Sequence, residues 1–285
     1  MRLRAATTLF MLLLLPPALA VTTAGSARAD EDVTAPTVQL DPWAHPSVGS
    51  QVEVIHDTRN GFTVWGADFE ISWSATDASG ICAQAVGWSS YDALGDDIEP
   101  LIGAPTTYFA VDPAARSFVA PGLDLFDWSR IRDRFIVRVT DCAGNVAYTN
   151  VADSEFGINE DNAHTVHYRG RWRTARSEDF AGGTIHATST SGARAIFGFS
   201  GSAPIALVMD TGPDRGEAGV YVDAVLVATV DTYAATARHR VVVWQDRFGP
   251  GAHRLELVNR ASEGRPRIDL DLVSSCPGEG SCLPD

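Results

Sequence analysis

Four aromatic residues and one carboxylate in the second half of the chain are the side chains best suited to hold a sugar ring. They are Tyr168, Trp172, Asp231, Tyr233 and Trp244. A flat aromatic ring packs against the apolar face of a pyranose, while polar groups around it bond the hydroxyls. The pattern predicts a carbohydrate-binding surface, provided that these rings lie exposed and together. The alternative is that Trp172 and Trp244 fill the core, the commoner position of aromatic side chains in a sandwich.

Two acidic residues near the end of the chain are the best candidates for a metal site. Asp269 and Asp271 alternate along one short run, so we expect them to share one face of a strand. Calcium prefers the hard oxygens that carboxylates supply. A structural calcium is therefore the one cofactor that we expect. The alternative is a pair of solvated acids on an exposed face.

Motifs of catalytic sites are absent from the sequence. There is no G-x-S-x-G, no H-E-x-x-H, no H-x-E with C-x-x-C, no P-loop and no G-x-G-x-x-G after a strand. His164 and His167 with Asp161 lie in a polar stretch, so we expect exposed histidines there rather than a metal site. We therefore predict no catalytic residues and no enzymatic activity. A carboxylate pair for glycoside hydrolysis stays open, because its separation is a spatial property.

The charge of the chain disfavours some partners. Its 285 residues hold 22 basic residues, all arginine, against 36 acidic ones, giving a net charge of −14. Nucleic acid is an unlikely partner, because binding to it depends on clustered positive charge. One arginine group, Arg169, Arg171, Arg173 and Arg176, could meet an acidic glycan or a neighbouring domain. The alternative is that these are solvated charges on a strand face.

The first residues have the three-part layout of a secretory signal. Arg2 and Arg4 precede a short apolar run, and small residues follow it. The run is too short to span a membrane. Cleavage after Ala20 or Ala29 fits the small-residue rule, and we favour Ala29 because acidic residues follow it directly. The sequence predicts a secreted, extracellular protein with no membrane span.

Cysteine usage agrees with export. Four cysteines allow three pairings: Cys82, Cys142, Cys276 and Cys282. The natural partition joins Cys82 to Cys142 and Cys276 to Cys282, since the last two close a very short loop. Zinc is disfavoured because no C-x2-C pair is present.

Short alternating runs indicate strands nearly throughout. In residues 69–74 Phe69, Ile71 and Trp73 fall on one face of the expected strand. Residues 134–141 show the same two-residue alternation. Alternation is lost over 153–165, which predicts a domain boundary, and six or more further strands follow. We therefore expect an all-β chain of two β-sandwich domains. The expected divisions are a signal peptide at 1–29, domains at 30–155 and 156–275, and a cystine-closed tail at 276–285.

Longer stretches resemble known families. WSATDASGIC (73–82) and VRVTDCAGNVA (137–147) resemble the strand-and-turn motifs of bacterial immunoglobulin-like domains. YRGRW (168–172), FAGGTIHATSTSGARAIFGFSG (180–201), GPGAHRLELV (249–258) and IDLDLV (268–273) are similar to galactose-binding-like jelly rolls and carbohydrate-binding modules of secreted actinobacterial proteins. One departure is the hairpin at Asp223 and Ala224, where an Asp-Gly turn is expected.

The resemblance implies an immunoglobulin-like domain followed by a jelly roll. Such jelly rolls often hold a structural calcium near their terminal strands. For function, the resemblance implies that the protein is secreted and non-catalytic. It would bind a polysaccharide or cell-surface glycan through the second domain, with the first domain as spacer or contact module. Two alternatives stay open: a structural or adhesive protein that binds other proteins and no glycan, and a glycan-active hydrolase.

Overall fold

The computed structural model describes most of the chain beyond the expected signal. The described residues are 32–41, 44–57, 62–92, 107–125, 131–149, 152–153, 157–201 and 204–275. The chain divides into two units, Met1–Asp32 and Val33–Asp285. The expected signal peptide with its cleavage sites lies outside the described residues, as do Cys276 and Cys282 in the expected tail.

The expectation of an all-β chain is confirmed. Apart from one 3-10 turn, η1 (Ala181–Gly183), every regular element in the described ranges is a β-strand. The strand pairings that build the sheets are antiparallel, as in sheets built from consecutive short strands. No helix in the described part of the chain is long and apolar enough to cross a membrane.

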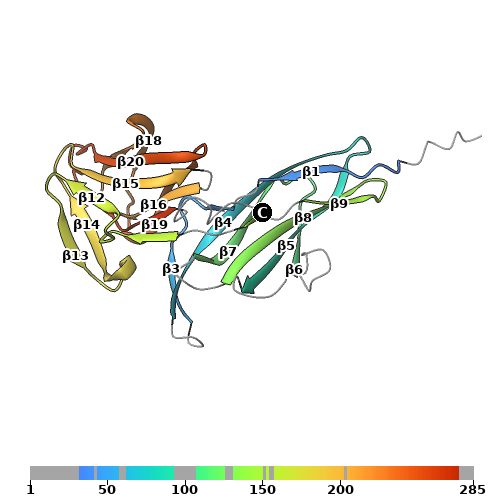
Figure 1. The fold of residues 1–285 in the computed structure, drawn as a ribbon, viewed down its shortest axis with the longest axis horizontal. Coiled ribbons are helices and arrows are strands. Elements are labelled where there is room, and N and C mark those ends of the chain that lie inside the picture. Colours follow the sequence, from blue (N-terminus) through green and yellow to red (C-terminus); the bar gives the residue numbers. More distant parts are fainter. Residues whose placement is uncertain are drawn as a thin grey trace, which may run out of the picture. The chain divides into compact units, whose positions relative to one another are not determined.

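Two sheets form the first half of the chain (Figure 1). The first is centred on β4 (Phe62–Thr76), and its partners are β1 (Thr37–Leu40), β2 (His45–Pro46), β3 (Glu53–Asp57) and β7 (Ser117–Leu125). The second has the order β10 (Ala152–Asp153), β8 (Ile131–Asp141), β5 (Ile81–Asp92), β6 (Thr107–Val111), with β9 (Val146–Tyr148) also paired to β8.

Alternating side chains of both sheets meet in one core, as the pattern predicts. Phe69, Ile71 and Trp73 of β4 are at most 5% exposed. They cluster with buried residues of β8, namely Phe135, Val137 and Val139. The one polar atom of Trp73 is satisfied, because its indole N–H donates to Oε1 of Gln84 at 2.7 Å. The first half is therefore a two-sheet sandwich with a conventional apolar core.

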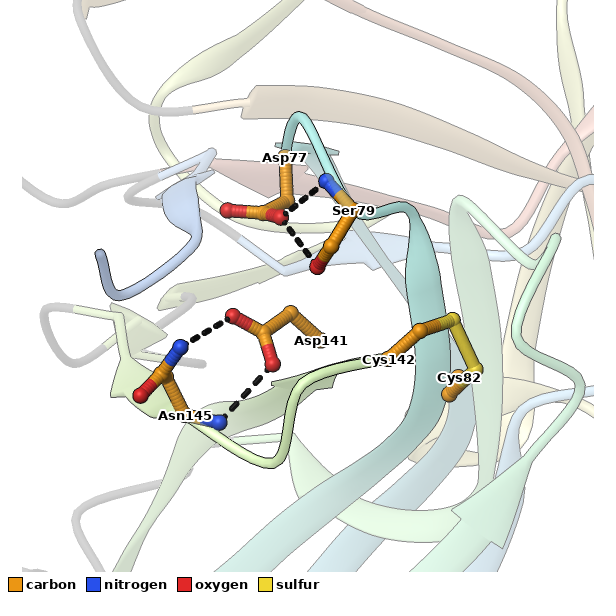
Figure 2. Close-up of a disulfide and its surroundings, with 6 residues drawn as sticks. All are labelled: Asp77, Ser79, Cys82, Asp141, Cys142 and Asn145. Carbon is orange, nitrogen blue, oxygen red and sulfur yellow. Dashed lines mark hydrogen bonds between the residues drawn. A yellow bond between two sulfur atoms is a disulfide. The ribbon is translucent and has the colours of Figure 1, made fainter. Parts of the chain in front are cut away.

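A disulfide joins Cys82, the second residue of β5, to Cys142 in the turn after β8 (Figure 2). In the turn before β5 the carboxylate of Asp77 accepts hydrogen bonds from the backbone and hydroxyl of Ser79, both at 2.7 Å. At the turn after β8, both oxygens of Asp141 accept hydrogen bonds from Asn145 at 2.8 Å. The predicted pairing of these two cysteines is confirmed.

Three sheets form the second half (Figure 1). The four-stranded sheet has the order β11 (Gly157–Glu160), β22 (Leu272–Ser275), β16 (Pro204–Thr211), β19 (Arg238–Arg247). The five-stranded sheet has the order β12 (Val166–Arg169), β15 (Arg194–Gly201), β20 (Gly251–Asn259), β17 (Glu217–Val222), β18 (Val225–Asp231). The three-stranded sheet has the order β13 (Arg173–Arg176), β14 (Thr184–Thr188), β21 (Ile268–Leu270). A second apolar cluster contains Phe197, Leu207 and Leu257, which come from strands of both larger sheets.

The hairpin between β17 and β18 turns at Asp223 and Ala224, whose φ angles are 51° and 67°. Positive φ at both central residues is the requirement of a type I′ turn. Asp223 is held from outside the turn, because its carboxylate lies 2.7 Å from Nδ1 of His253 and accepts the backbone N–H of Arg254 at 2.9 Å. These contacts help to hold a conformation that alanine adopts at a cost.

A segment of the first half pairs with the edge strand β19 of the second. Gly49 N–H donates to the carbonyl of Val242 at 2.7 Å, and Val52 N–H donates to that of Arg240 at 2.7 Å. Val242 N–H in turn donates to the carbonyl of Ser50 at 2.9 Å. The ladder covers backbone groups that an edge strand otherwise leaves open.

Candidate functional site

An open groove lies over β13 and β14, with a volume of about 520 Å³. Its lining is rich in guanidinium and hydroxyl groups: Arg171, Arg173, Thr174, Ala175, Ala187, Thr188, Ser189, Thr190 and Arg267. Such a lining offers charged donors together with hydroxyls that both donate and accept.

Strand pairing and one buried threonine shape this groove. Arg173 of β13 stands opposite Ala187 of β14 in the antiparallel register. Thr188 is 4% exposed, and its hydroxyl donates to the carbonyl of Arg171 at 2.6 Å. The same oxygen accepts the backbone N–H of Thr190 at 3.1 Å. One side chain therefore ties the strand-entry segment at Arg171 to the rim at Thr190.

Asn259 supports the rim from beneath, and the sequence analysis did not identify it. Its side chain is 1% exposed, and its amide donates to the carbonyls of Thr188 at 3.3 Å and Pro266 at 2.9 Å. It thereby links β14 to the segment that leads into Arg267. The only signal in the sequence was a polar residue at the end of an alternating run, which many strands have.

Trp172 contacts Tyr168, and both rings pack against the second apolar cluster. Their ring centroids are 4.9 Å apart, and Tyr168 also stacks on His186 at 4.3 Å. Gly170 makes the turn between the two aromatics with a φ of 89°. A Cβ there would lie only 3.0 Å from the Cβ of Ala193, so glycine suits both the angle and the space. Trp172 is half-buried and stands between two groove-lining arginines in the sequence.

The three arginines of the groove differ in their partners. Nε of Arg267 donates to Oδ1 of Asp269 at 2.8 Å, and Arg267 lies 3.6 Å from Asp214. Arg171 and Arg173 are exposed, and neither has a carboxylate partner among the residues that the structure describes. The groove therefore carries two uncompensated positive charges.

A chain of hydrogen bonds begins at the groove and ends on a buried carboxylate. Thr174 Oγ1 lies 3.1 Å from Nε2 of His186, whose Nδ1 lies 2.6 Å from Oδ2 of Asp161. Thr184 also donates to Asp161 at 2.7 Å. Asp161 is fully buried, although it lies in a polar stretch whose His164 and His167 are exposed as predicted. The reason is that both of its oxygens have partners inside the fold.

The predicted aromatic surface is only partly assembled. Trp244 is 8% exposed and belongs to the second apolar cluster, opposite Leu207 in the strand register. It is therefore a core residue, which corrects its assignment as a ligand-binding ring. The remaining residues fall into two pairs, Tyr168 with Trp172 and Asp231 with Tyr233.

These two pairs lie apart. Tyr168 is on β12 and Asp231 on β18, the opposite edges of the five-stranded sheet. Asp231 is engaged by Arg265, with N–O distances of 2.9 and 3.3 Å, and these bonds lower the pKa of its carboxyl. The guanidinium carbon of Arg265 also lies 4.8 Å from the ring centroid of Tyr233. Asp231 and Tyr233 thus form a closed cluster of their own, and a single surface with Trp172 is not formed.

The two candidate calcium ligands are buried rather than exposed. Asp269 and Asp271 are both 0% exposed, and they do not share one strand, because the chain passes from β21 to β22 at Asp271. Arg215 and Arg267 bond the two oxygens of Asp269, so guanidinium groups stand where a cation would bind. Asp269 therefore does not fit a calcium site, and the two carboxylates do not form one together.

Asp271 has one satisfied and one free oxygen. Its Oδ1 accepts the backbone N–H of Ala181 at 2.9 Å, whereas the buried Oδ2 has no hydrogen-bond partner among the described residues. Burial raises the pKa of this carboxyl to about 8, and the nearby Asp210 and Asp161 add to the effect. Of the two predicted ligands, only Asp271 therefore offers a free oxygen of the kind that calcium prefers.

Comparison with known proteins gives distant structural likenesses. No protein-family model matches the chain, and no curated protein matches its sequence. One similar structure is the CBM36-1 domain of a multidomain xylanase from the hindgut metagenome of Trinervitermes trinervoides, at 13% identity and a TM-score of 0.31, covering 44% of this chain and 99% of that one.

Two further similar structures come from enzymes. The catalytic domain of a GH87 alpha-1,3-glucanase in complex with nigerose is 12% identical at a TM-score of 0.31, covering 46% of this chain and 30% of that one. A family two carbohydrate esterase from Cellvibrio japonicus is 13% identical at a TM-score of 0.30, covering 42% and 33%. The chain thus spans about a third or less of each enzyme structure. Likeness at this level assigns neither activity nor ligand.

Proposed function

We propose that this chain is a secreted, non-catalytic protein that binds carbohydrate at the groove over β13 and β14. The observation that carries the proposal is the groove lining itself, which offers hydroxyl and guanidinium donors, with the half-buried Trp172 between Arg171 and Arg173 in the sequence. Sugar hydroxyls are bonded by such polar groups, and an aromatic ring accepts the apolar face of a pyranose. The first half then serves as a spacer or contact module.

Two features support export. The first residues have the layout of a secretory signal, and a disulfide joins Cys82 to Cys142. Disulfides persist in oxidising compartments. Calcium enters the proposal only through the free oxygen of Asp271, so binding is measured with added calcium and with a chelator.

A second candidate function is ester hydrolysis, and one observation favours it. In the chain Thr174–His186–Asp161, His186 is placed to accept the hydroxyl proton as Thr174 Oγ1 attacks an ester carbonyl and to return it to the departing alcohol, while Asp161 would orient the imidazole. Water would then hydrolyse the acyl-threonine and release the acid. The buried carboxyls Asp161, Asp210 and Asp271 line no part of the groove, so they do not support glycoside hydrolysis there. Release of acetate from acetylated glycans, absent in Thr174→Ala, would establish hydrolysis in place of the non-catalytic proposal.

The proposal is tested with the purified mature protein and a panel of soluble and insoluble polysaccharides. Trp172→Ala is the test variant, and Tyr233→Ala is its matched control. Tyr233 is an exposed aromatic residue that follows β18, at the opposite edge of the five-stranded sheet from β12. Ser189→Ala is a second test that removes one groove hydroxyl and leaves the core untouched. Melting temperatures show that each variant is folded.

Saturable binding that Trp172→Ala and Ser189→Ala weaken and Tyr233→Ala retains is the expected result. We expect the loss of the ring to weaken binding about tenfold or more, since a stacked aromatic contributes on the order of 1 kcal/mol beyond its buried area. Absence of binding to every glycan, with calcium or with chelator, would overturn the proposal in favour of a structural or protein-binding role.

A further inference from the structure

We infer that the groove is specific for an anionic glycan, one carrying carboxylate or sulfate groups. This inference rests on the proposed function and names the ligand class of the same site. It starts from the pairing of arginine side chains across the described part of the second half.

Six of the thirteen arginines in this half are neutralised by a carboxylate. Those that pair with a carboxylate are Arg194, Arg215, Arg247, Arg254, Arg265 and Arg267. The segment of β12, β13 and the turn between them holds four of the remaining seven. Four of its residues are exposed arginines without any such partner in the described structure: Arg169, Arg171, Arg173 and Arg176.

This concentration of free positive charge is notable in a chain whose net charge is −14. An acidic protein offers many carboxylates to which an arginine could pair, yet these four project into solvent. Two of them, Arg171 and Arg173, line the groove, and Arg267 adds a third guanidinium to its lining. Arg267 is partly neutralised by Asp269, so the charge available to a ligand comes mainly from Arg171 and Arg173.

Guanidinium groups select for planar or tetrahedral anions. The fixed fork of N–H donors in arginine matches the two oxygens of a carboxylate or sulfate, and charge-assisted bonds are about twice as strong as neutral ones. The hydroxyls of Ser189 and Thr190 supply hydrogen bonds to the hydroxyls of a sugar. A polyanion without sugar rings would pair with the arginines but would make no hydrogen bonds of this kind with the groove hydroxyls.

The test uses four probes with the full mature protein. Polygalacturonate presents carboxylates and dextran sulfate presents sulfates, whereas dextran is the neutral counterpart and poly-L-glutamate is a polyanion without sugar. The test variant is Arg171→Gln with Arg173→Gln. The matched control is Arg169→Gln with Arg176→Gln, which removes the same number of equally exposed, unpaired charges outside the groove.

We expect the protein to bind polygalacturonate or dextran sulfate in preference to dextran and poly-L-glutamate. The groove variant should bind at least about tenfold more weakly, since each lost charge-assisted bond is worth on the order of 1.5 kcal/mol or more, while the control variant binds within about threefold of wild type. Binding should also weaken as salt rises. Whichever acidic probe binds more tightly identifies the anionic group.

Other outcomes separate the inference from the function beneath it. Binding of neutral glycans alone, lost in Trp172→Ala and unchanged in the groove variant, would overturn the anionic specificity and leave carbohydrate binding standing. Equal binding of poly-L-glutamate would overturn the assignment to a glycan, and equal weakening in the control variant would overturn the location. No binding to any sugar probe would overturn both proposals.

Discussion

At the scale of single residues, the second half is unusual in burying several aspartates completely. Asp161, Asp210, Asp269 and Asp271 are all 0% exposed. Three of them have charged or histidine partners: His186 for Asp161, His239 for Asp210 and Arg215 for Asp269. Asp271 has only a backbone donor, so the cost of ionising it inside the fold is the least compensated.

The first prediction concerns the pH dependence that Asp271 imposes. Its pKa is raised to about 8 in the folded state, while in the unfolded chain it titrates near 4. Between these values the folded protein holds a proton that the unfolded chain has lost, so rising pH lowers the free energy of unfolding across this window. Asp271→Asn cannot ionise, and we expect its stability relative to wild type to improve steadily from about pH 4 to about pH 8.

Urea unfolding of both proteins at several pH values measures this difference. A difference that does not change with pH would contradict the assigned protonation. A calcium arm at pH 8 addresses the metal: stabilisation of wild type by calcium, absent in Asp271→Asn, would show that the ionised carboxylate binds the cation.

At the scale of elements, the first half depends on two turns that a covalent bond holds together. Cys82 follows the turn after β4 and Cys142 begins the turn after β8, at a sequence separation of 60. The turns also share a backbone hydrogen bond, from Cys142 N–H to the carbonyl of Gly80 at 3.0 Å. The disulfide therefore reinforces a contact that the backbone already makes.

The second prediction is that Cys82→Ser with Cys142→Ser lowers the free energy of unfolding of this half by about 4 kcal/mol, because the open chain regains the entropy of a 60-residue loop. Urea denaturation measures it, and Ser79→Ala serves as a control that alters the same turn without opening the loop. An unchanged midpoint in the double variant would mean that the unfolded chain is already restricted there.

At the scale of the whole molecule, the ladder between residues 47–52 and β19 joins the two halves of the chain. An ion pair adds to it, since Arg247 donates to Asp41 at 2.7 Å. Residues of both halves, among them Val52 and Val242, also belong to one apolar cluster. The halves thus share backbone hydrogen bonds and buried surface, which couple their unfolding.

The third prediction is that heating gives one calorimetric transition, with equal calorimetric and van't Hoff enthalpies. Val52→Pro removes the N–H that bonds Arg240 and should separate the transition into two. Val52→Ala is the control, because it keeps that N–H and loses only packing, so its single transition should shift to lower temperature. Two transitions in wild type would show that the halves unfold independently.

The sequence by itself determined which residues form strands and which faces enter the core. The two-residue period at Phe69, Ile71 and Trp73 is sufficient for this, because successive side chains of a strand point to opposite faces whatever the strand pairs with. The pairing of Cys82 with Cys142 followed from similar turn segments beside each cysteine. These are local features, so local pattern was enough.

Only the tertiary structure decided which side chains meet. Strand order placed Tyr168 and Asp231 on opposite edges of one sheet and brought Arg267 to the same groove as Arg171, although 95 residues separate them in sequence. It also placed Trp244 in the core and surrounded Asp269 with guanidinium groups. Alternation fixes the face of a strand that a residue occupies, but the neighbours of that face depend on long-range pairing, which no local spacing encodes.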